Sequence, residues 1–260
     1  MGTQSKLKKN MLRLILISIA GTMIYGLPYF RSYYYDAYLQ TYGLTNSQMG
    51  MFGSIFGIMG ACSYLFGGVV ADMFSARKLM TISMILTGLG GLLHLFHPSY
   101  LMLVGIYFLW GFTSLFAFWP ALLKVLRSLA NEDEQSKAYG FMDATRGITN
   151  AVQLAVTLAI FNALSKKASD LAGLNGVVIF YSAVCIVMGI GLYFVLDEKK
   201  LQTGSDDAED DSKFSFAIVK QVLKMPVVWL LSLVVCCSYT MPILFYYFTP
   251  YATANLGMTA

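Results

Sequence analysis

Two arginines stand inside apolar stretches of this chain, where a charge is costly. Arg31 lies in "GLPYFRSYYYD", residues 26–36, and Arg146 lies in "YGFMDATRG", residues 139–147. A guanidinium at the centre of a membrane helix costs about 3 kcal/mol unless it meets water or a partner, so each arginine is a candidate functional residue. A guanidinium presents paired N–H donors to a carboxylate, a sulfonate or a phosphate. The two arginines therefore predict an anion-binding site.

Acidic and aromatic side chains accompany the two arginines. Asp143 stands three residues before Arg146, so the two side chains share a helical face and can form an ion pair. Three tyrosines follow Arg31 at spacings of three, four and seven residues on the same face of a continuous helix: Tyr34, Tyr35 and Tyr38. They could stack on a sugar-like ligand and hydrogen-bond it. In the alternative interpretation they form an interfacial aromatic belt, and Arg31 extends to the membrane surface.

Histidine provides little metal-binding chemistry. His94 and His97 share one helical face, but a zinc site needs three or four ligands and no third one is in sight. We expect no metal site, no cofactor and no catalytic residues, so the chain is not predicted to be an enzyme.

The elements that position these residues are predicted to be membrane-spanning helices. The sequence is 57% hydrophobic and 12% charged, whereas soluble domains carry about 25% charged residues. Apart from Asp143 and Arg146, charged residues are missing from six stretches: 14–30, 48–71, 79–123, 138–165, 174–196 and 225–260. A span needs about 20 residues, and the 79–123 stretch holds two spans broken at "HPS", residues 97–99. We predict an all-α membrane protein with seven spans.

The depth of Arg31 depends on the first helix. If that helix runs from Leu12 to Gln40, Arg31 lies about 13 Å inside its outer end, at about 1.5 Å per residue. That depth makes a water-filled cavity or a buried partner the expected environment of Arg31.

The distribution of basic residues predicts the orientation. With a cytoplasmic N-terminus, 14 of the 18 Lys and Arg residues fall on the cytoplasmic side and three on the outer side. Such a bias is the positive-inside signal. The sequence pI of about 8.7 therefore reflects the basic residues of the cytoplasmic segments. We expect the lipid bilayer as the surrounding partner and no nucleic acid.

The chain divides into three parts. Residues 1–196 hold six predicted spans, residues 197–224 form a polar, acidic linker expected in the cytoplasm, and residues 225–260 hold one span. Sliding the sequence on itself by 214 positions places Tyr25 and Pro28 on Tyr239 and Pro242. We therefore interpret the last span as the first helix of a second, parallel copy of the six-helix unit.

The loop after the second span carries a recognisable pattern. The segment "GGVVADMFSARK", residues 67–78, resembles the major facilitator signature, with Gly68, Asp72, Arg77 and Lys78 in register. The resemblance implies a cytoplasmic gate that closes while the outer side is open. An Asp at a helix end can pair with a neighbouring basic side chain, and Lys124 and Arg127 are the candidate partners.

Other segments resemble one branch of that superfamily, the glycerol-3-phosphate transporter family and related organic-anion transporters. The segment "YFRSYYYDAYLQTYGLTNSQMG" is similar to that family's first helix, with its substrate arginine at Arg31, and "FWPALLK" is similar to its fourth, at Trp119. The family's substrate histidine falls on Arg146. The segments "WPALLK" and "EQSKAYGF" also resemble uncharacterised bacterial members of the superfamily. The resemblance implies Arg31, Arg146 and Trp119 as substrate-binding residues.

Two departures from the family favour a carboxylate or sulfonate over a phosphate ester. The seventh span lacks the family's second arginine, since no Lys or Arg follows Lys224, and Ile24 and Pro28 replace two family tyrosines. The expected function is secondary transport of a small organic anion by alternating access, coupled to H⁺ or Na⁺ or to antiport. The resemblance also implies a bacterial inner-membrane monomer, of which this chain lacks most of the second bundle. The alternatives are a non-transporting membrane sensor and a drug or metabolite exporter.

Overall fold

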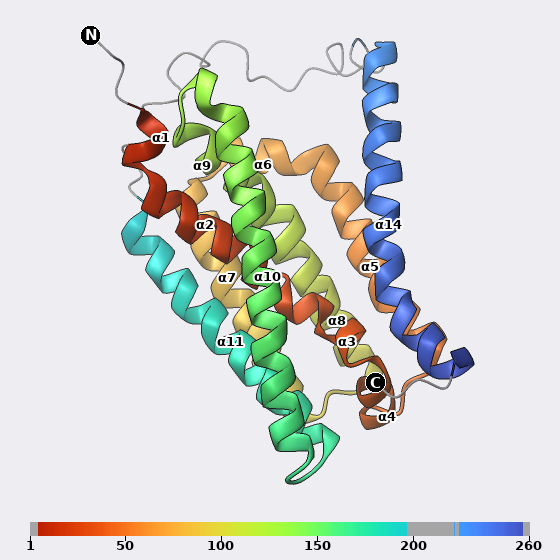
Figure 1. The fold of residues 1–260 in the computed structure, drawn as a ribbon. Helices are drawn as coiled ribbons and strands as arrows, with labels where there is room; N and C mark the ends of the chain where they lie inside the picture. The colour runs from red at the N-terminus through yellow and green to blue at the C-terminus, as the bar shows by residue number, and fades with distance from the viewer. Residues whose placement is uncertain (1–4, 197–220, 222–223, 257–260) are drawn as a thin grey trace.

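Helices make up nearly all of the regular structure. The computed structural model describes residues 5–196, 221 and 224–256, and no strand occurs among them. Except for residues 221 and 224, the predicted linker 197–224 lies outside the described residues. The α-helices in Figure 1 are α1 (Lys6–Lys9), α2 (Met11–Met23), α3 (Gly26–Tyr33), α4 (Tyr35–Thr41), α5 (Asn46–Cys62), α6 (Gly68–Met73), α7 (Ala76–Leu92), α8 (Tyr100–Gly111), α9 (Trp119–Ser128), α10 (Gln135–Ser165), α11 (Asp170–Val195) and α14 (Pro226–Leu256).

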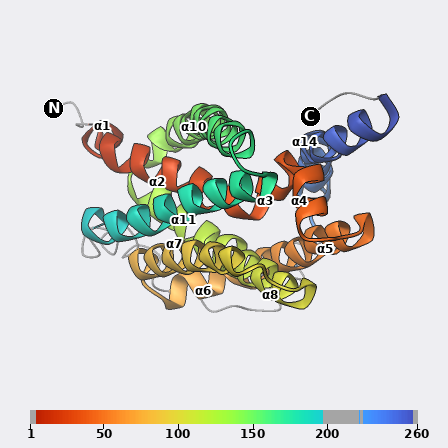
Figure 2. The same ribbon diagram turned by 90° about the horizontal axis from the view of Figure 1, so that it is seen from below.

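The long helices stand side by side as a bundle. Seen along the bundle in Figure 2, α11 and the α2–α3 pair lie between α10 on one side and α7, α8 and α5 on the other. Helix α14 packs against α3 and α4. The end of the bundle that carries α1, the α6–α7 turn and the α9–α10 turn is called the basic end below, because Lys6, Lys8, Lys78 and Arg127 lie there.

The first long helix is bent, so the continuous helix from Leu12 to Gln40 that was assumed for the depth of Arg31 does not form. Helices α2 and α3 meet at Ile24 and Tyr25 with a bend of 47°. Pro28 accounts for the bend, because its ring nitrogen has no N–H for the carbonyl of Ile24 and its ring crowds that carbonyl. A second break follows at Tyr34, whose backbone has φ −114° and ψ 43°.

Two neighbouring helices contain π-helical segments. The first π segment, Ser63–Gly67, joins α5 to α6, and the second, Phe112–Phe118, joins α8 to α9. The hydroxyl of Ser63 donates to the carbonyl of Leu115, so the two segments are bonded to each other. Pro120 lacks an N–H for the carbonyl of Phe116, which favours the wider turn. A Cβ on Gly67 would lie 2.7 Å from Cγ of Pro120, so only glycine fits there.

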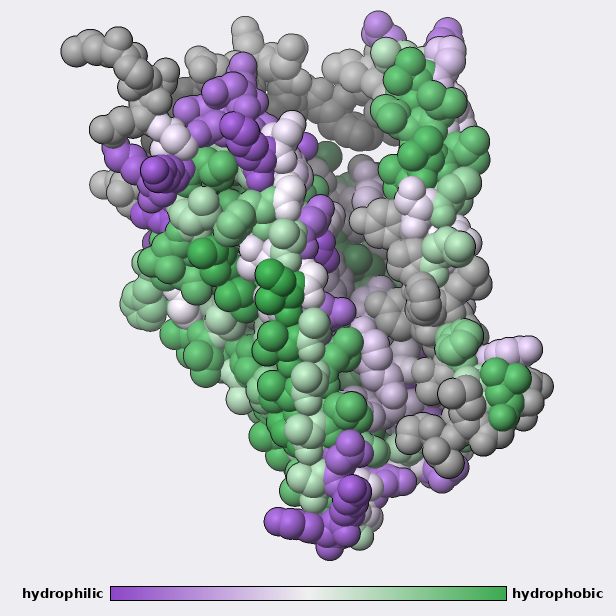
Figure 3. Space-filling view, viewed as in Figure 1, coloured by the Kyte–Doolittle hydropathy of each residue, from purple (hydrophilic) through white to green (hydrophobic). Residues whose placement is uncertain are grey.

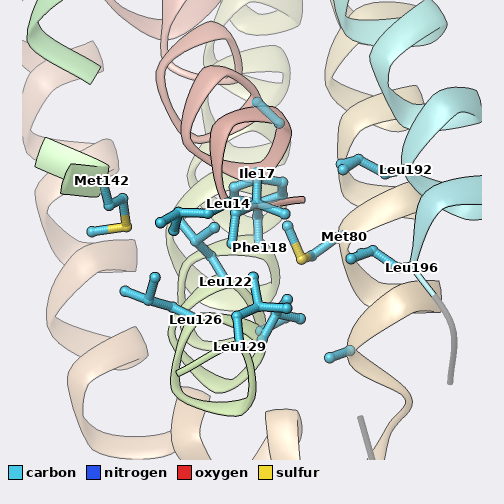
Figure 4. Close-up of a cluster of buried hydrophobic side chains, with 14 of the residues drawn as sticks. Leu14, Ile17, Met80, Phe118, Leu122, Leu126, Leu129, Met142, Leu192 and Leu196 are labelled. Atoms are coloured by element: carbon cyan, nitrogen blue, oxygen red, sulfur yellow. The ribbon is translucent and has the colours of Figure 1, made fainter. Parts of the chain in front are cut away.

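Two apolar clusters hold the bundle together. One fills the half nearer the basic end and is shown in Figure 4, where Leu14 and Ile17 from α2 meet Phe118 of the second π segment and side chains of α9, α7 and α11. The other fills the opposite half and is largely aromatic, with Phe30, Phe52, Tyr107 and Trp110 at its centre. Tyr25 packs against both clusters, because it lies at the bend between them.

Small residues let α7 and α11 approach closely. A Cβ on Gly88 would lie 2.8 Å from the carbonyl oxygen of Ser182, and one on Gly189 would lie 3.2 Å from the carbonyl oxygen of Thr81. Close backbone approach through small residues is a principal source of helix association in lipid.

The helices suit a membrane. Four described helices are long and apolar enough to span it, or five if the bent pair α2 and α3 counts as one span; the number of seven stays a prediction. Figure 3 shows hydrophobic side chains over the middle of the visible face and hydrophilic ones at both ends. Hydrophilic side chains also follow the edge of α10 that faces α14. Only 11% of the most apolar window of Glu132–Ser165 is buried, so α10 lies at the margin of the bundle.

Candidate anion-binding site

Arg146 lies half-buried on α10 with part of its guanidinium in reach of a ligand. Its side chain is 28% exposed, and Nη1 lies 3.3 Å from Oδ1 of Asp143, as the spacing predicted. The Trp119 ring covers the guanidinium, with Cζ at 4.9 Å from the ring centroid. The Thr22 hydroxyl donates to the Arg146 carbonyl at 3.4 Å, which fixes Arg146 at the level of α2. An arginine in this setting retains N–H donors for an anion.

Arg31 contacts a different set of residues from those around Arg146. Its Nη1 donates to the carbonyl of Met49 at 3.1 Å, and its Cζ lies 5.4 Å from the ring centroid of Tyr107 and 6.0 Å from that of Phe52. These partners belong to α5 and α8. The cation–π contacts and the carbonyl satisfy part of the guanidinium and hold it toward the end of the bundle away from the basic end.

The three predicted tyrosines do not share one face with Arg31, because the helix breaks at Tyr34. The ring of Tyr34 packs on Phe161 of α10 at 4.6 Å, and the hydroxyl of Tyr35 donates to Oδ1 of Asn46 at 2.8 Å. Tyr38 is fully buried, with its hydroxyl 3.1 Å from Nε2 of His94. The three tyrosines therefore contact different elements, and the ligand role of these three residues stays a prediction.

The two histidines also separate. His94 is buried and stacks on Trp110 with centroids 5.0 Å apart, whereas His97 is exposed and has a left-handed backbone with φ 51°. In the part of the chain that the structure describes, no group of three or more His, Cys, Asp or Glu side chains could hold a metal ion.

A row of aromatic side chains extends from Arg146, and the sequence reasoning missed most of it. The Trp119 ring lies 6.4 Å from that of Tyr25, the Tyr25 ring 6.2 Å from that of Tyr29, and the Tyr29 ring 5.4 Å from that of Phe56. We call these four residues the aromatic row. Tyr25 and Tyr29 are four residues apart, which is the helical spacing that could have signalled a shared face.

The predicted gate residues form links between helices at the basic end. Nζ of Lys124 on α9 lies 3.2 Å from Oδ1 of Asp72 and donates to the carbonyl of Ala71 at 3.0 Å. Lys124 is thus the partner of Asp72, while the other candidate, Arg127, donates to the Tyr139 hydroxyl at 3.4 Å. The pair is exposed, with side-chain exposures of 64% for Asp72 and 37% for Lys124, so water weakens its attraction.

The other gate residues have structural partners as well. Arg77 lies 4.2 Å above the ring of Tyr193 and donates to the carbonyl of Leu196, which joins α7 to the end of α11. Gly68 begins α6, and the backbone N–H of Lys78 donates to the Ser75 hydroxyl at the start of α7. The segment that resembled the signature therefore forms the turn between α6 and α7.

Comparison with known proteins decides the family. Residues 13–260 match the family model described as Major Facilitator Superfamily. The chain belongs to this superfamily. Among relatives of this superfamily chain, the inner membrane protein YqcE of Escherichia coli is 31% identical over 253 residues, covering 96% of the chain and 58% of YqcE. The inner membrane protein YihN of the same organism is 29% identical over 225 residues, covering 86% of the chain and 53% of YihN.

A third relative comes from a different bacterium. The uncharacterized protein MG294 homolog of Mycoplasma pneumoniae is 25% identical over 258 residues, covering 93% of the chain and 54% of the relative. The chain therefore spans little more than half the length of these relatives. The family match and the all-helical structure agree with a membrane protein of this superfamily, and the names of the two Escherichia coli relatives place those proteins in the inner membrane.

Proposed function

We propose that this major facilitator chain forms the anion-binding half of a secondary transporter that moves a small organic anion by alternating access. The observation that supports this most is Arg146, a guanidinium within an apolar helix that is 28% exposed beside Trp119 and Asp143. An anion bound there would offset the charge of a guanidinium that is costly in a dehydrated, closed state. Arg31 is proposed as a second, outer contact for the same anion.

The proposal includes an orientation and a gate. The basic end faces the cytoplasm, because 14 of the 18 Lys and Arg residues then lie on that side. The Asp72–Lys124 pair and Gly68, Arg77, Lys78 and Arg127 belong to the gate at this end. The chain acts as a monomer with seven spans, residues 197–224 form a cytoplasmic linker, and the coupling partner is H⁺, Na⁺ or a second anion. A carboxylate, a sulfonate and a phosphate ester are the candidate headgroups.

The first experiment is uptake into proteoliposomes that contain the protein as the cell produces it. The panel is a sugar acid, a sulfonated sugar and a sugar phosphate, each with and without an imposed gradient of H⁺ or Na⁺. Saturable uptake of one anion class supports the proposal. Binding without uptake under any gradient would make the protein a sensor, and uptake of bulky cations would make it an exporter; either result contradicts the proposal.

A variant of the gate pair tests the role of the basic end. We expect Asp72→Asn to lower the uptake rate roughly three- to ten-fold, because a partly exposed ion pair contributes only about 1 kcal/mol. Affinity for the anion should stay the same, since Asp72 lies at the basic end rather than beside Arg146. The matched control is Asp133→Asn, an exposed carboxylate at the same end. A fall in affinity without a change in rate would remove Asp72 from the gate.

A further inference from the structure

Asp143 is the only acidic residue within the six apolar stretches of the sequence. It lies eight residues after Gln135, which begins α10, and therefore about 12 Å along a helix that rises about 1.5 Å per residue. A carboxylate at that depth in a membrane helix is costly, and such residues commonly belong to proton pathways. The position of Asp143 makes it a candidate for moving a proton.

The carboxylate of Asp143 neutralises the guanidinium of Arg146. Its Oδ1 accepts a hydrogen bond from Nη1 of Arg146 at 3.3 Å. The Trp119 ring that covers the guanidinium carries no charge, and Thr22 donates to the backbone carbonyl of Arg146 rather than to its side chain. The ion pair as a whole is uncharged, which lowers the cost of enclosing it in apolar surroundings. An anion that binds Arg146 must therefore compete with Asp143 for the same guanidinium.

The two members of the pair differ in their access to water. The side chain of Asp143 is 66% exposed, whereas that of Arg146 is 28% exposed. Water can thus deliver a proton to the carboxylate while the guanidinium stays against Trp119. An arginine does not lose its proton in proteins. Asp143 is the member of the pair whose charge can change.

Other charged groups near the pair have partners of their own. The cations on α2 and α9 are bonded elsewhere, Arg13 to Asn10, Lys124 to Asp72 and Arg127 to Tyr139. Arg146 is the cation to which Asp143 is bound. The charged and titratable groups on the elements around α10 are Arg13 on α2, Tyr25 at the bend before α3, Lys124 and Arg127 on α9, Asp170, Tyr181, Cys185 and Tyr193 on α11, Glu132, Asp133 and Glu134 in the turn before α10, and Lys137 and Tyr139 on α10 itself.

A proton suits this carboxylate better than a metal ion does. Hard metal cations take about six or more oxygen ligands, whereas a proton needs one carboxylate oxygen. Among the residues that the structure describes, Asp143 does not belong to a group of three or more His, Cys, Asp or Glu side chains that could hold a metal ion.

We propose that Asp143 carries the coupling proton: an anion that binds Arg146 displaces the Asp143 carboxylate, which takes up a proton from water. This inference rests on the proposed function, since it uses Arg146 as the contact for the anion. One O–H bond forms at the carboxylate, and the proton returns to water on the other side when the anion leaves and Asp143 pairs with Arg146 again. Arg31 keeps its charge throughout, so the exchange is the same for a singly or a doubly charged headgroup.

The exchange prevents closure around the anion alone. A carboxylate displaced from its guanidinium and still ionised would be enclosed without a counter-ion, which is costly. The empty site with the Asp143–Arg146 pair can close, and so can the site that holds both the anion and the proton. The anion and the proton therefore cross together, and a gradient of H⁺ drives accumulation of the anion.

Binding to the purified protein at a series of pH values tests the proton uptake. The probe is whichever of glucuronate, isethionate and glucose 6-phosphate binds the unmodified protein most tightly, between about pH 7.5 and 9, where the charge of all three is constant. Because binding takes up one proton, we expect the affinity to fall about ten-fold for each unit by which the pH rises. Asp143→Asn, which resembles the protonated acid, should bind the probe at least as tightly as the unmodified protein and equally at every pH.

Transport in proteoliposomes separates coupling from binding. Asp143→Asn should exchange internal for external probe within about two-fold of the unmodified rate but lose the accumulation driven by an imposed H⁺ gradient. Asp143→Glu keeps an acid at nearly the same place and should retain both the pH dependence and the driven accumulation. Asp143→Ser replaces Asp143→Asn, with the same expected result, if the asparagine variant does not elute as a folded protein.

The matched control is Asp36→Asn. Asp36 is a half-buried carboxylate on α4, at the end of the bundle away from the basic end. Its substitution should leave the pH dependence of binding, the exchange and the driven accumulation unchanged. Loss of the pH dependence in Asp36→Asn and not in Asp143→Asn would place the proton on Asp36 and overturn the inference.

The remaining outcomes separate the inference from the proposed function. Binding that does not depend on pH, an unchanged pH dependence in Asp143→Asn, loss of binding in that variant, or accumulation driven by Na⁺ and not by H⁺ each overturns the proton role and leaves the anion transporter intact. If uptake occurs without measurable binding, the driven accumulation of the Asp143 variants decides. No binding of any probe together with no uptake of any anion overturns the proposed function and the inference with it.

Discussion

Arg146→Gln is expected to reduce anion uptake at least a hundred-fold. The substitution removes the charge and the paired donors and leaves a shorter, uncharged polar side chain. Two charge-assisted hydrogen bonds are worth about 1.5–3 kcal/mol each, and each 1.4 kcal/mol corresponds to about ten-fold. Initial uptake rates and equilibrium binding should fall together, because the headgroup contact is lost in every conformation of the cycle.

The control for this variant is Arg13→Gln. Arg13 lies on α2 near the basic end, where its Nη1 donates to Oδ1 of Asn10 at 3.2 Å. The same chemical change there should leave both uptake and binding within two-fold of the unmodified protein. Uptake that survives in Arg146→Gln but disappears in Arg13→Gln would place the anion at the basic end instead.

Gly88→Leu is expected to cause a large loss of stability. Even a Cβ at this position would lie 2.8 Å from both the carbonyl oxygen of Ser182 and Cγ1 of Ile186. A whole side chain must therefore push α7 and α11 apart. Overpacking of this kind costs about 1–3 kcal/mol or more. We expect the apparent melting temperature in detergent to fall on the order of 10 °C, since 1 kcal/mol shifts a domain of this size by about 2–4 °C.

Gly191→Leu is the matched control for Gly88→Leu. Gly191 lies on α11, the partner helix of α7, but a Cβ there would meet no atom within 4 Å. Leucine favours a helix over glycine by up to about 1 kcal/mol, so this variant should keep or slightly raise the melting temperature. Equal melting temperatures for both variants would show that α7 and α11 are not held by close packing at Gly88.

Local spacing predicted the pairs that lie within one helix or next to a motif. Asp143 and Arg146 form the ion pair expected from three-residue spacing, and Lys124 is one of the two partners foreseen for Asp72. The prediction of an all-α membrane protein followed from the long apolar stretches and their few charges. These features depend on composition and on neighbours in the chain, which a sequence displays directly.

The surroundings of Arg31 and the aromatic row could not be predicted in the same way. A straight-helix projection places Tyr34 and Tyr38 on one face with Arg31, but the break at Tyr34 separates α3 from α4, and the two tyrosines contact different elements. Pro28 was a visible signal for the bend. The direction of the bend, and with it the neighbours of Tyr25 and Tyr29, depends on packing between distant helices.

The two π segments determine how far the helices that follow them are rotated around their own axes. A π turn accommodates about one residue more than an α turn, and one residue corresponds to about 100° of rotation around the axis. The second π segment therefore sets the direction in which α9 presents Trp119 to Arg146 and Lys124 to Asp72. Winding all the residues of Phe112–Phe118 as a regular α-helix would turn both side chains away together, which no substitution at either position could do. In this fold the number of residues in a turn, as much as their identity, determines the pairing of the site and the gate.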